Sequence, residues 1–293
     1  MIDALQGLVE RLENDPSFFE PNRLRERLEA LNLLDAYIPD TPRGVSDHEL
    51  HEEGVNSRAR AIYARLEAVN CELYGGIRNE IQRGNRPEAL LQWAAFSAKI
   101  VDTPGPLNGV GYDYLDELIS GIFQFEEPDE GSVQREPEKV FYQPTPARHI
   151  FSLISQTALT SEDVLIDLGS GLGHVSLLVS ICTPARSLGI ELEATYIERA
   201  QKCAQNLKLD RVTFFHQDAH AADLSAGTVF YLYTPFTGSV LNGVVTLLRR
   251  EAETRRIRIC TYGPCTSVVA QETWLETAAA PETNRIALFR SCS

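Results

Sequence analysis

The residues best placed to do chemistry form one run, Val164-Leu165-Ile166-Asp167-Leu168-Gly169-Ser170-Gly171-Leu172-Gly173. An apolar stretch that leads into closely spaced glycines is typical of a buried strand turning into a helix, where the backbone can approach a ligand closely. Such a turn can receive a pyrophosphate at the helix N-terminus. Here the sixth position from Gly169 is His174 rather than Gly or Ala, and Asp167 would repel a pyrophosphate. The carboxylate instead favours a ligand with ammonium and sulfonium charge, by about 1–4 kcal/mol in a surface-like dielectric.

Short apolar runs alternate with helical patterns throughout the second half of the chain, which is typical of a parallel sheet built from βαβ units. Gly189-Ile190-Glu191 ends the second expected strand, about twenty residues past the glycine turn, where an acid can accept the hydroxyls of a ribose. The pattern predicts strands at 164–167, 188–191, 212–215, 228–233 and 257–262, helices at 172–182, 195–207 and 240–250, and a closing hairpin of 274–277 and 285–290.

The first half repeats apolar residues at helical spacing, as in the stripe Ile62, Leu66, Val69, Leu73, Ile77 and Ile81. Such stripes are core seams far more often than ligand sites. Residues 126–132 are polar and rich in structure breakers, which suits a linker. We therefore expect a helical cap or accessory domain over residues 1–130 and a second, α/β domain over residues 138–293.

The run from Asp167 to Gly173 matches the D-x-G-x-G-x-G motif, and the second half thus resembles the class I S-adenosylmethionine-dependent methyltransferases. The resemblance implies a Rossmann-like seven-stranded methyltransferase sheet with its last strand antiparallel, and S-adenosyl-L-methionine as cofactor. It further implies that Glu191 holds the ribose and that Asp218, in Gln217-Asp218-Ala219, accepts the amine of adenine. The expected cofactor-binding residues are Tyr142, Thr145, Asp167, Gly169, Gly171, Gly173, Glu191, Asp218 and Ala219.

The family places the methyl acceptor at the end of the fourth strand, here Tyr233-Thr234-Pro235-Phe236. This stretch resembles the Asn/Asp-Pro-Pro-Tyr/Phe motif of amino-directed methyltransferases, but it lacks the leading Asn or Asp and one proline. Transfer to nitrogen therefore stays one alternative, and a strand-ending turn is another. Tyr233, Thr234, Pro235 and Phe236 are the candidate catalytic residues. A hydroxyl or ammonium acceptor would need a general base, for which His149, His174, His216 and His220 are the candidates.

The glycine run and Gly189-Ile190-Glu191 also resemble, locally, the nucleosomal lysine methyltransferases that lack a SET domain. Those enzymes hold DNA with a basic segment, whereas residues 1–140 here carry a net charge of −13 and the remaining residues −1. The acidic half makes nucleic acid an unlikely partner. The methyl acceptor is thus left open between a small molecule and a basic protein. A related group transfer, such as aminopropyl transfer, and a non-catalytic cofactor-binding module are the alternative functions.

Composition sets the remaining limits. The 293 residues are 43% hydrophobic and 23% charged, which is ordinary for a globular protein. The sequence shows neither a basic leader before an apolar block nor an apolar run long enough for a membrane span, so we expect a cytoplasmic protein. The six cysteines form no CxxC pair and are expected to be reduced thiols. The His and Cys spacings fit no metal template, so no metal is expected.

Overall fold

The computed structural model describes residues 2–37, 47–101, 111–125, 143–233 and 238–292. Contacts divide the chain into two compact units, Met1–Ile77 and Arg78–Ser293, and the division falls inside one long helix, α3 (Asp47–Gln82). The linker expected at 126–132 lies outside the described residues. The helices at 88–101 and 114–123, which we expected in a domain ending at residue 130, belong to the same unit as the sheet, because they pack against the helix at 147–157.

The first unit is a small helical bundle. It contains α1 (Ile2–Asn14), a short 3₁₀ helix (Pro16–Phe19) capped by Asp15, α2 (Leu24–Tyr37) and most of α3. Arg27 is fully buried, and its guanidinium donates to the Asn70 side chain (2.7 Å) and to the carbonyl oxygens of the turn before α2. The apolar stripes of the sequence meet in one core, formed by Leu5, Leu8, Val9, Leu12, Ala30, Leu31, Leu34, Val55, Ala59, Ile62 and Leu66.

The second unit is built on a seven-stranded sheet of order β3-β2-β1-β4-β5-β7-β6. Neighbours from β3 to β5 are parallel, and β7 runs antiparallel to β5 and β6, which confirms the expected Rossmann-like methyltransferase sheet. The strands are β1 (Val164–Leu168), β2 (Arg186–Glu191), β3 (Val212–His216), β4 (Val229–Tyr233), β5 (Arg258–Tyr262), β6 (Leu275–Thr277) and β7 (Ala287–Ser291).

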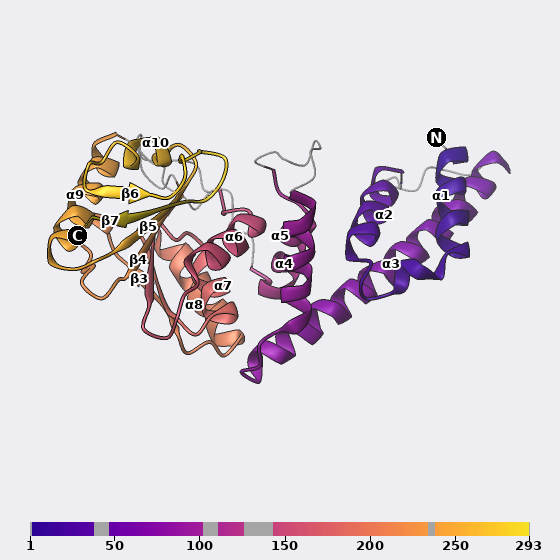
Figure 1. Ribbon diagram of the computed structural model, residues 1–293. Coiled ribbons are helices and arrows are strands. Elements are labelled where there is room, and N and C mark those ends of the chain that lie inside the picture. Colours follow the sequence, from indigo (N-terminus) through magenta and orange to yellow (C-terminus); the bar gives the residue numbers. More distant parts are fainter. Residues whose placement is uncertain (1, 38–46, 102–110, 126–142, 234–237, 293) are drawn as a thin grey trace. The chain divides into compact units, whose positions relative to one another are not determined.

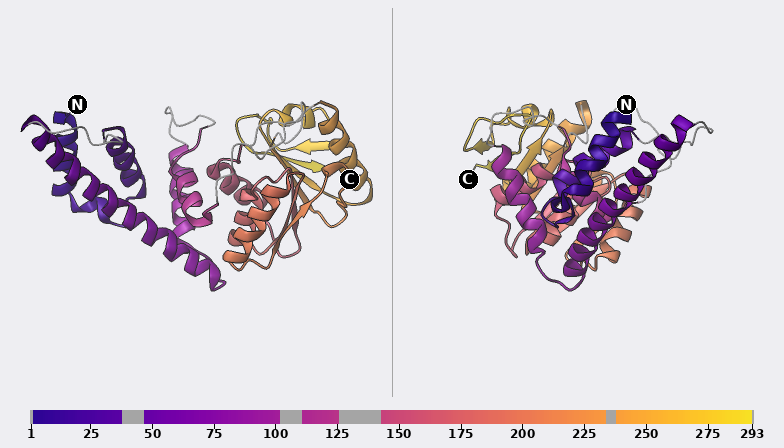
Figure 2. Two further views of the ribbon diagram at one scale, coloured as in Figure 1. Left: turned by 180° about the vertical axis from the view of Figure 1, so that it is seen from behind. Right: turned by 90° about the vertical axis from the view of Figure 1, so that its right-hand side faces the viewer.

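Helices cover both faces of this sheet (Figures 1 and 2), as expected for strands that read as continuous apolar runs. One face carries α6 (Ala147–Thr157), α7 (His174–Cys182) and α8 (Ala194–Asn206), and the other carries α9 (Gly238–Thr254) and α10 (Cys265–Val269). A core of strand residues such as Ile166, Phe230 and Ile259 packs against Leu241 and Leu248 of α9. The unit also contains α4 (Glu88–Val101), α5 (Tyr114–Phe123) and a 3₁₀ turn (Ala219–Ala221).

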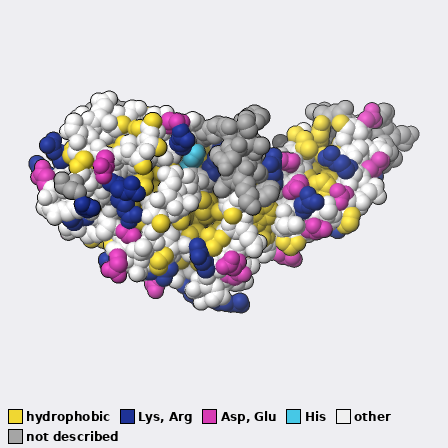
Figure 3. Space-filling view, viewed as in Figure 1, with side chains coloured by type: hydrophobic (Ala, Val, Ile, Leu, Met, Phe, Trp, Pro, Cys, Tyr) yellow, Lys and Arg dark blue, Asp and Glu magenta, His cyan; other side chains and the backbone are white. Residues whose placement is uncertain are grey.

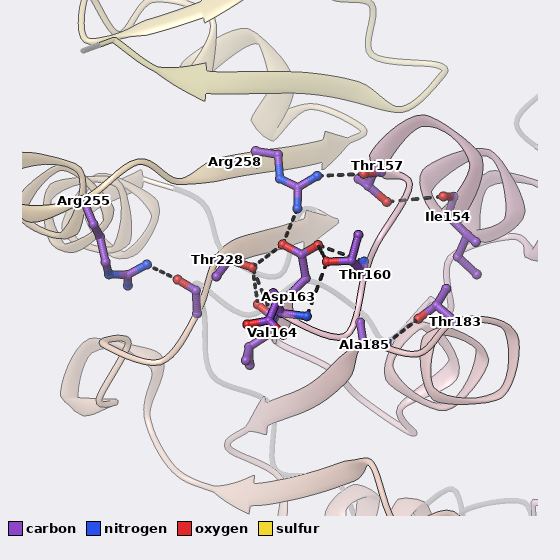
Figure 4. Close-up of polar contacts among 12 residues, drawn as sticks. Ile154, Thr157, Thr160, Asp163, Val164, Thr183, Ala185, Thr228, Arg255 and Arg258 are labelled. Atoms are coloured by element: carbon purple, nitrogen blue, oxygen red, sulfur yellow. Dashed lines mark hydrogen bonds and ion pairs between the residues drawn. The ribbon is translucent and has the colours of Figure 1, made fainter.

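The amino ends of β1, β4 and β5 are joined by a polar network (Figure 4). Arg258 donates to the Asp163 carboxylate (2.5 Å) and to the carbonyl oxygen of Thr157 at the end of α6 (2.7 Å). The Thr228 hydroxyl donates to the same carboxylate (2.8 Å), which also accepts the backbone N–H of Thr160 (2.9 Å). These bonds lower the pKa of Asp163 below its ordinary value, against the effect of its partial burial. The edge is thus held by partners that satisfy one another.

On the face drawn in Figure 3, basic and acidic side chains are interspersed. A pocket of about 430 Å³ lies at the amino edge and is lined in part by Asp163, Thr228 and Arg258, whose polar atoms already bind one another. None of the helices in the described ranges is both long and apolar enough to span a membrane.

Candidate active site

The glycine turn connects β1 to α7 at the carboxyl edge of the sheet. The backbone N–H groups of Gly169 and Ser170 donate to the carbonyl oxygen of Ile190 in β2 (2.9 and 3.0 Å). Gly169, Gly171 and Gly173 have φ angles of 80°, 53° and 81°, a left-handed region that residues with side chains rarely adopt. The sequence therefore needs glycine here for backbone geometry.

The Phe214 ring gives a second reason why two positions near the turn must be glycine. A Cβ atom placed on Gly173 or on Gly189 would lie 2.5 Å from the Phe214 ring. Real carbon atoms do not approach so closely, so the ring can lie beneath the turn only where both positions lack a side chain. Phe214 thus sets how close β2, β3 and the turn come to one another.

Asp167 lies one residue before the end of β1 and is 4% exposed. Burial, together with the negative charge of Glu191, raises its pKa to about 8. A buried carboxyl group is costly unless a positive partner or hydrogen-bond donors satisfy it. The Ser170 hydroxyl, close by in the turn, is also buried without a hydrogen-bond partner among the described residues. An ammonium group bound at this place would satisfy both.

Glu191 ties the turn to the end of β2. One carboxylate oxygen accepts the N–H of Gly171 (2.9 Å), and the other accepts those of Leu192 (2.7 Å) and Glu193 (2.9 Å). A carboxylate offers about four acceptor positions, so three are already used. Glu191 therefore positions the glycine turn as well as facing the expected ribose site, a structural role that its spacing alone did not reveal.

Asp218 follows β3 and caps the 3₁₀ turn that begins with the buried Ala219. Its Oδ1 accepts the backbone N–H of His220 (2.9 Å) and lies 3.3 Å from the His220 ring nitrogen Nδ1. Because β3, β2 and β1 are neighbours, Asp218, Glu191 and Asp167 lie in that order along one sheet edge. Parallel α/β sheets bind ligands at this carboxyl edge.

Thr145 is buried just before α6, and its hydroxyl bonds to the Tyr231 hydroxyl (2.8 Å). Tyr231 is in register with Asp167 on the neighbouring strand, and burial raises its pKa well above 10. The Thr145 side chain is therefore engaged by the strand that lies beside Asp167. Tyr142, the other upstream candidate, lies outside the described residues.

Aromatic rings gather where β4 and β5 end. Tyr233 is in register with Tyr262, and their ring centroids are 4.7 Å apart. His149, in the first turn of α6, stacks on Tyr262 at 4.3 Å. Of the four candidate catalytic residues, Tyr233 is brought into this cluster, and Thr234, Pro235 and Phe236 lie outside the described residues.

The other candidate histidines have structural surroundings. His174 packs against the rings of Phe123 and Phe125, and burial lowers its pKa to about 4. A ring nitrogen of His216 lies 2.9 Å from the carbonyl oxygen of Leu192, and His220 lies against Asp218. The sequence analysis did not name Tyr262 as a candidate. Its position at the end of the fifth expected strand, next to the fourth, could have indicated it.

Comparisons with known proteins find one family model and several solved structures. A family model described as histone methylation protein DOT1 matches residues 138–231, less than half of the chain. Similar solved structures include an RNA methyltransferase from Salinibacter ruber bound to S-adenosyl-L-homocysteine (24% identity, 51% of this chain and 92% of that chain, TM-score 0.42) and the putative methyltransferase yhhF from Escherichia coli (15%, 50% and 87%, 0.42). Another is an S-adenosylmethionine-dependent methyltransferase from Geobacter sulfurreducens (23%, 39% and 47%, 0.33). No curated protein sequence matches.

The methyltransferase model covers the segment in which the glycine turn, Glu191 and Asp218 lie along one sheet edge. The buried Asp167 lies within the same matched segment, on the strand that leads into the glycine turn. Residues 138–231 thus match a methyltransferase family model and lie in a sheet with the strand order of the class I S-adenosylmethionine-dependent methyltransferases.

Proposed function

We propose that the enzyme methylates an amine nitrogen on a basic protein. The observation that carries the proposal is the stacked pair Tyr233 and Tyr262 at the ends of β4 and β5, of which β4 is the direct neighbour of β1. Aromatic faces attract a cationic amine at close range. The net charge of −13 over residues 1–140 would favour a basic partner, and the matching family model is described by histone methylation.

In the proposed site, one group of residues binds the cofactor and another positions the acceptor amine. When bound, the cofactor supplies a methyl carbon on a sulfonium whose sulfur keeps the electron pair of the broken bond. Asp167, Glu191 and Asp218 would hold its ammonium, ribose and adenine. The residues at the ends of β4 and β5 have to hold the amine nitrogen in line with the methyl carbon and exclude water. Burial beside the rings removes water from a bound ammonium and lowers its pKa, against the attraction of the ring faces, so that it loses a proton and the free base attacks. The new N–C bond leaves a proton that passes to solvent.

The test is transfer of labelled methyl from S-adenosyl-L-methionine to purified core histones, followed by amino-acid analysis of the product. We expect labelled methyllysine or another methylated amine, with Tyr233→Ala strongly impaired and Asp167→Ala inactive. Leu33→Ala, on an exposed side chain of the first unit, is the control that keeps activity. Label on oxygen or carbon, or label only on small molecules in a protein-free extract, would contradict the proposal.

The partner and the compartment belong to the same proposal. A small-molecule acceptor is the competing candidate, and the extract arm of the experiment detects it. The six free cysteines, four of them buried, agree with a reducing compartment, and we propose the cytoplasm.

A further inference from the structure

Two polar atoms in the aromatic cluster are buried without a hydrogen-bond partner. Tyr262 is 0% exposed, and neither its Oη nor the Nε2 of His149 has a partner within the described part of the chain. Leaving a buried donor or acceptor unsatisfied costs about 1–3 kcal/mol. Native structures contain few such atoms, so each calls for a physical reason.

Packing does not explain why these two residues carry polar atoms. Tyr262 is the middle ring of a row, 4.3 Å from His149 and 4.7 Å from Tyr233, with interplanar angles of 30° and 36°. Phenylalanine at either position would make the same ring contacts without burying an unsatisfied atom. The two atoms can therefore take a hydrogen-bonding group that the described residues do not supply.

Both side chains are neutral at physiological pH. Burial, with a smaller effect of the Arg148 charge, lowers the pKa of His149 to about 4, and burial raises the pKa of Tyr262 to about 12. In the tautomer protonated at Nδ1, His149 Nε2 is an acceptor, while Tyr262 Oη can accept or donate. Such a pair suits an uncharged amine, which offers N–H donors and a lone pair.

The row also lies next to the cofactor side of the site. Tyr233 and Tyr262 end β4 and β5, and β4 is the direct neighbour of β1, which carries Asp167. His149 lies four residues after Thr145, whose hydroxyl bonds to Tyr231 of β4. A group bound at the row is therefore at the same sheet edge as the glycine turn.

We propose that His149 Nε2 and Tyr262 Oη hydrogen-bond the acceptor amine and direct its lone pair towards the methyl group. This inference rests on the proposed function and adds the residues that hold its substrate. Both are catalytic residues in the sense that they touch the reacting nitrogen. Tyr233 forms the apolar wall of the same subsite.

Substitutions that remove the polar atoms but keep an aromatic side chain separate this role from a structural one. Tyr262→Phe removes only the hydroxyl, and His149→Phe keeps an aromatic side chain but removes both ring nitrogens. We expect each variant to unfold at or above the wild-type temperature, because an unsatisfied buried atom is gone, and to bind S-adenosyl-L-methionine unchanged. Transfer to core histones should fall at least about tenfold in kcat/KM, which corresponds to losing one hydrogen bond to the reacting group. His149→Gln, which restores an acceptor, should recover part of the loss.

Tyr63→Phe is the matched control, since Tyr63 packs against the core of the first unit. If wild-type enzyme labels an amine and both Phe variants do so equally well, this inference is wrong and the proposed function stands. If wild-type enzyme labels no amine, the proposed function itself is wrong.

A second measurement needs no protein acceptor. In enzyme saturated with S-adenosyl-L-homocysteine, n-butylamine should shift the ¹⁵N resonance of His149 Nε2, and Tyr262→Phe should weaken that binding. An unchanged resonance at saturating n-butylamine would overturn the inference.

Discussion

The two edges of the sheet handle buried polar groups in opposite ways. At the amino edge, Asp163, Arg258 and Thr228 satisfy one another through short hydrogen bonds. At the carboxyl edge, the Asp167 carboxyl is buried with its pKa raised to about 8, and the polar atoms of Ser170 and Tyr262 are buried without partners in the described residues. Polar residues at the amino edge therefore stabilise the fold, whereas we expect those at the carboxyl edge to bind ligands.

This difference predicts where substitutions harm folding and where they harm chemistry. Satisfied groups stabilise the fold, so removing one partner leaves the other exposed to a desolvation penalty. Unsatisfied groups destabilise the free protein, so removing them is harmless to the fold and harmful to binding. Four measurements test this contrast, and they follow in order of decreasing effect.

Glu191→Ala should have the largest effect, because the Glu191 carboxylate both holds the fold through hydrogen bonds and is expected to bind the ligand. The substitution removes the acceptor for the ribose and also three backbone hydrogen bonds that hold the glycine turn. Two charge-assisted hydrogen bonds of about 1.5 kcal/mol each correspond to roughly 100-fold weaker binding of S-adenosyl-L-methionine. Calorimetric titration measures this, with the exposed Glu198→Ala in α8 as the control. Equal affinities in both variants would remove Glu191 from the site.

Asp163→Ala tests the amino edge. The charge of Arg258, whose side chain is 24% exposed, would lose its partner, and the Thr228 hydroxyl would lose its acceptor. We expect the free energy of unfolding to fall by about 2 kcal/mol, below the value for a fully buried pair. Urea denaturation measures it, with Asp210→Ala, an 87% exposed carboxylate, as control. Cofactor affinity per folded molecule should not change, and a large change there would refute the separation of the two edges.

Asp167 predicts a pH dependence of cofactor binding. In the free protein its pKa is about 8, whereas a bound ammonium stabilises the ionised carboxylate. Below pH 8 binding must release a proton, so the dissociation constant should rise up to about tenfold for each unit that the pH falls. Titrations from pH 7.5 down to pH 6 measure this slope. The Asp167→Asn variant is the control, because its remaining pH dependence comes from the cofactor itself. The same slope in both proteins would contradict the assignment.

Ser170→Ala should have the smallest effect. The Ser170 hydroxyl is buried without a partner among the described residues, so its removal should change the free energy of unfolding by less than about 1 kcal/mol. Cofactor affinity should fall about threefold if a ligand satisfies the hydroxyl. Ser180→Ala is matched, because that hydroxyl is likewise unsatisfied but lies within α7. Thermal unfolding and titration of both variants decide whether Ser170 faces the ligand.

The fold and the cofactor edge could be predicted from sequence because their signals are local. The glycine run, the acid at 191 and the acid at 218 each follow an apolar strand, and their order in the chain fixes their order along the sheet. The last strand was expected antiparallel, and β7 is. The roles of the individual residues in holding the cofactor stay predictions.

What escaped the sequence depends on contacts between distant segments. The row of His149, Tyr262 and Tyr233 forms because β5 lies beside β4 and α6 packs near their ends. No spacing in the sequence reports that proximity. The division of the chain at Ile77 escaped for a different reason, since it falls inside α3, which continues as one helix through Gly75 and Gly76.

Phe214 carries a consequence for evolution. Its ring occupies the space that a side chain at Gly173 or Gly189 would need. Three positions from three different elements are therefore constrained as one. Among homologous sequences a bulkier residue at 189 should appear together with a smaller one at 214, and a lineage that changes one without the other should lose the close approach of the strands beneath the turn.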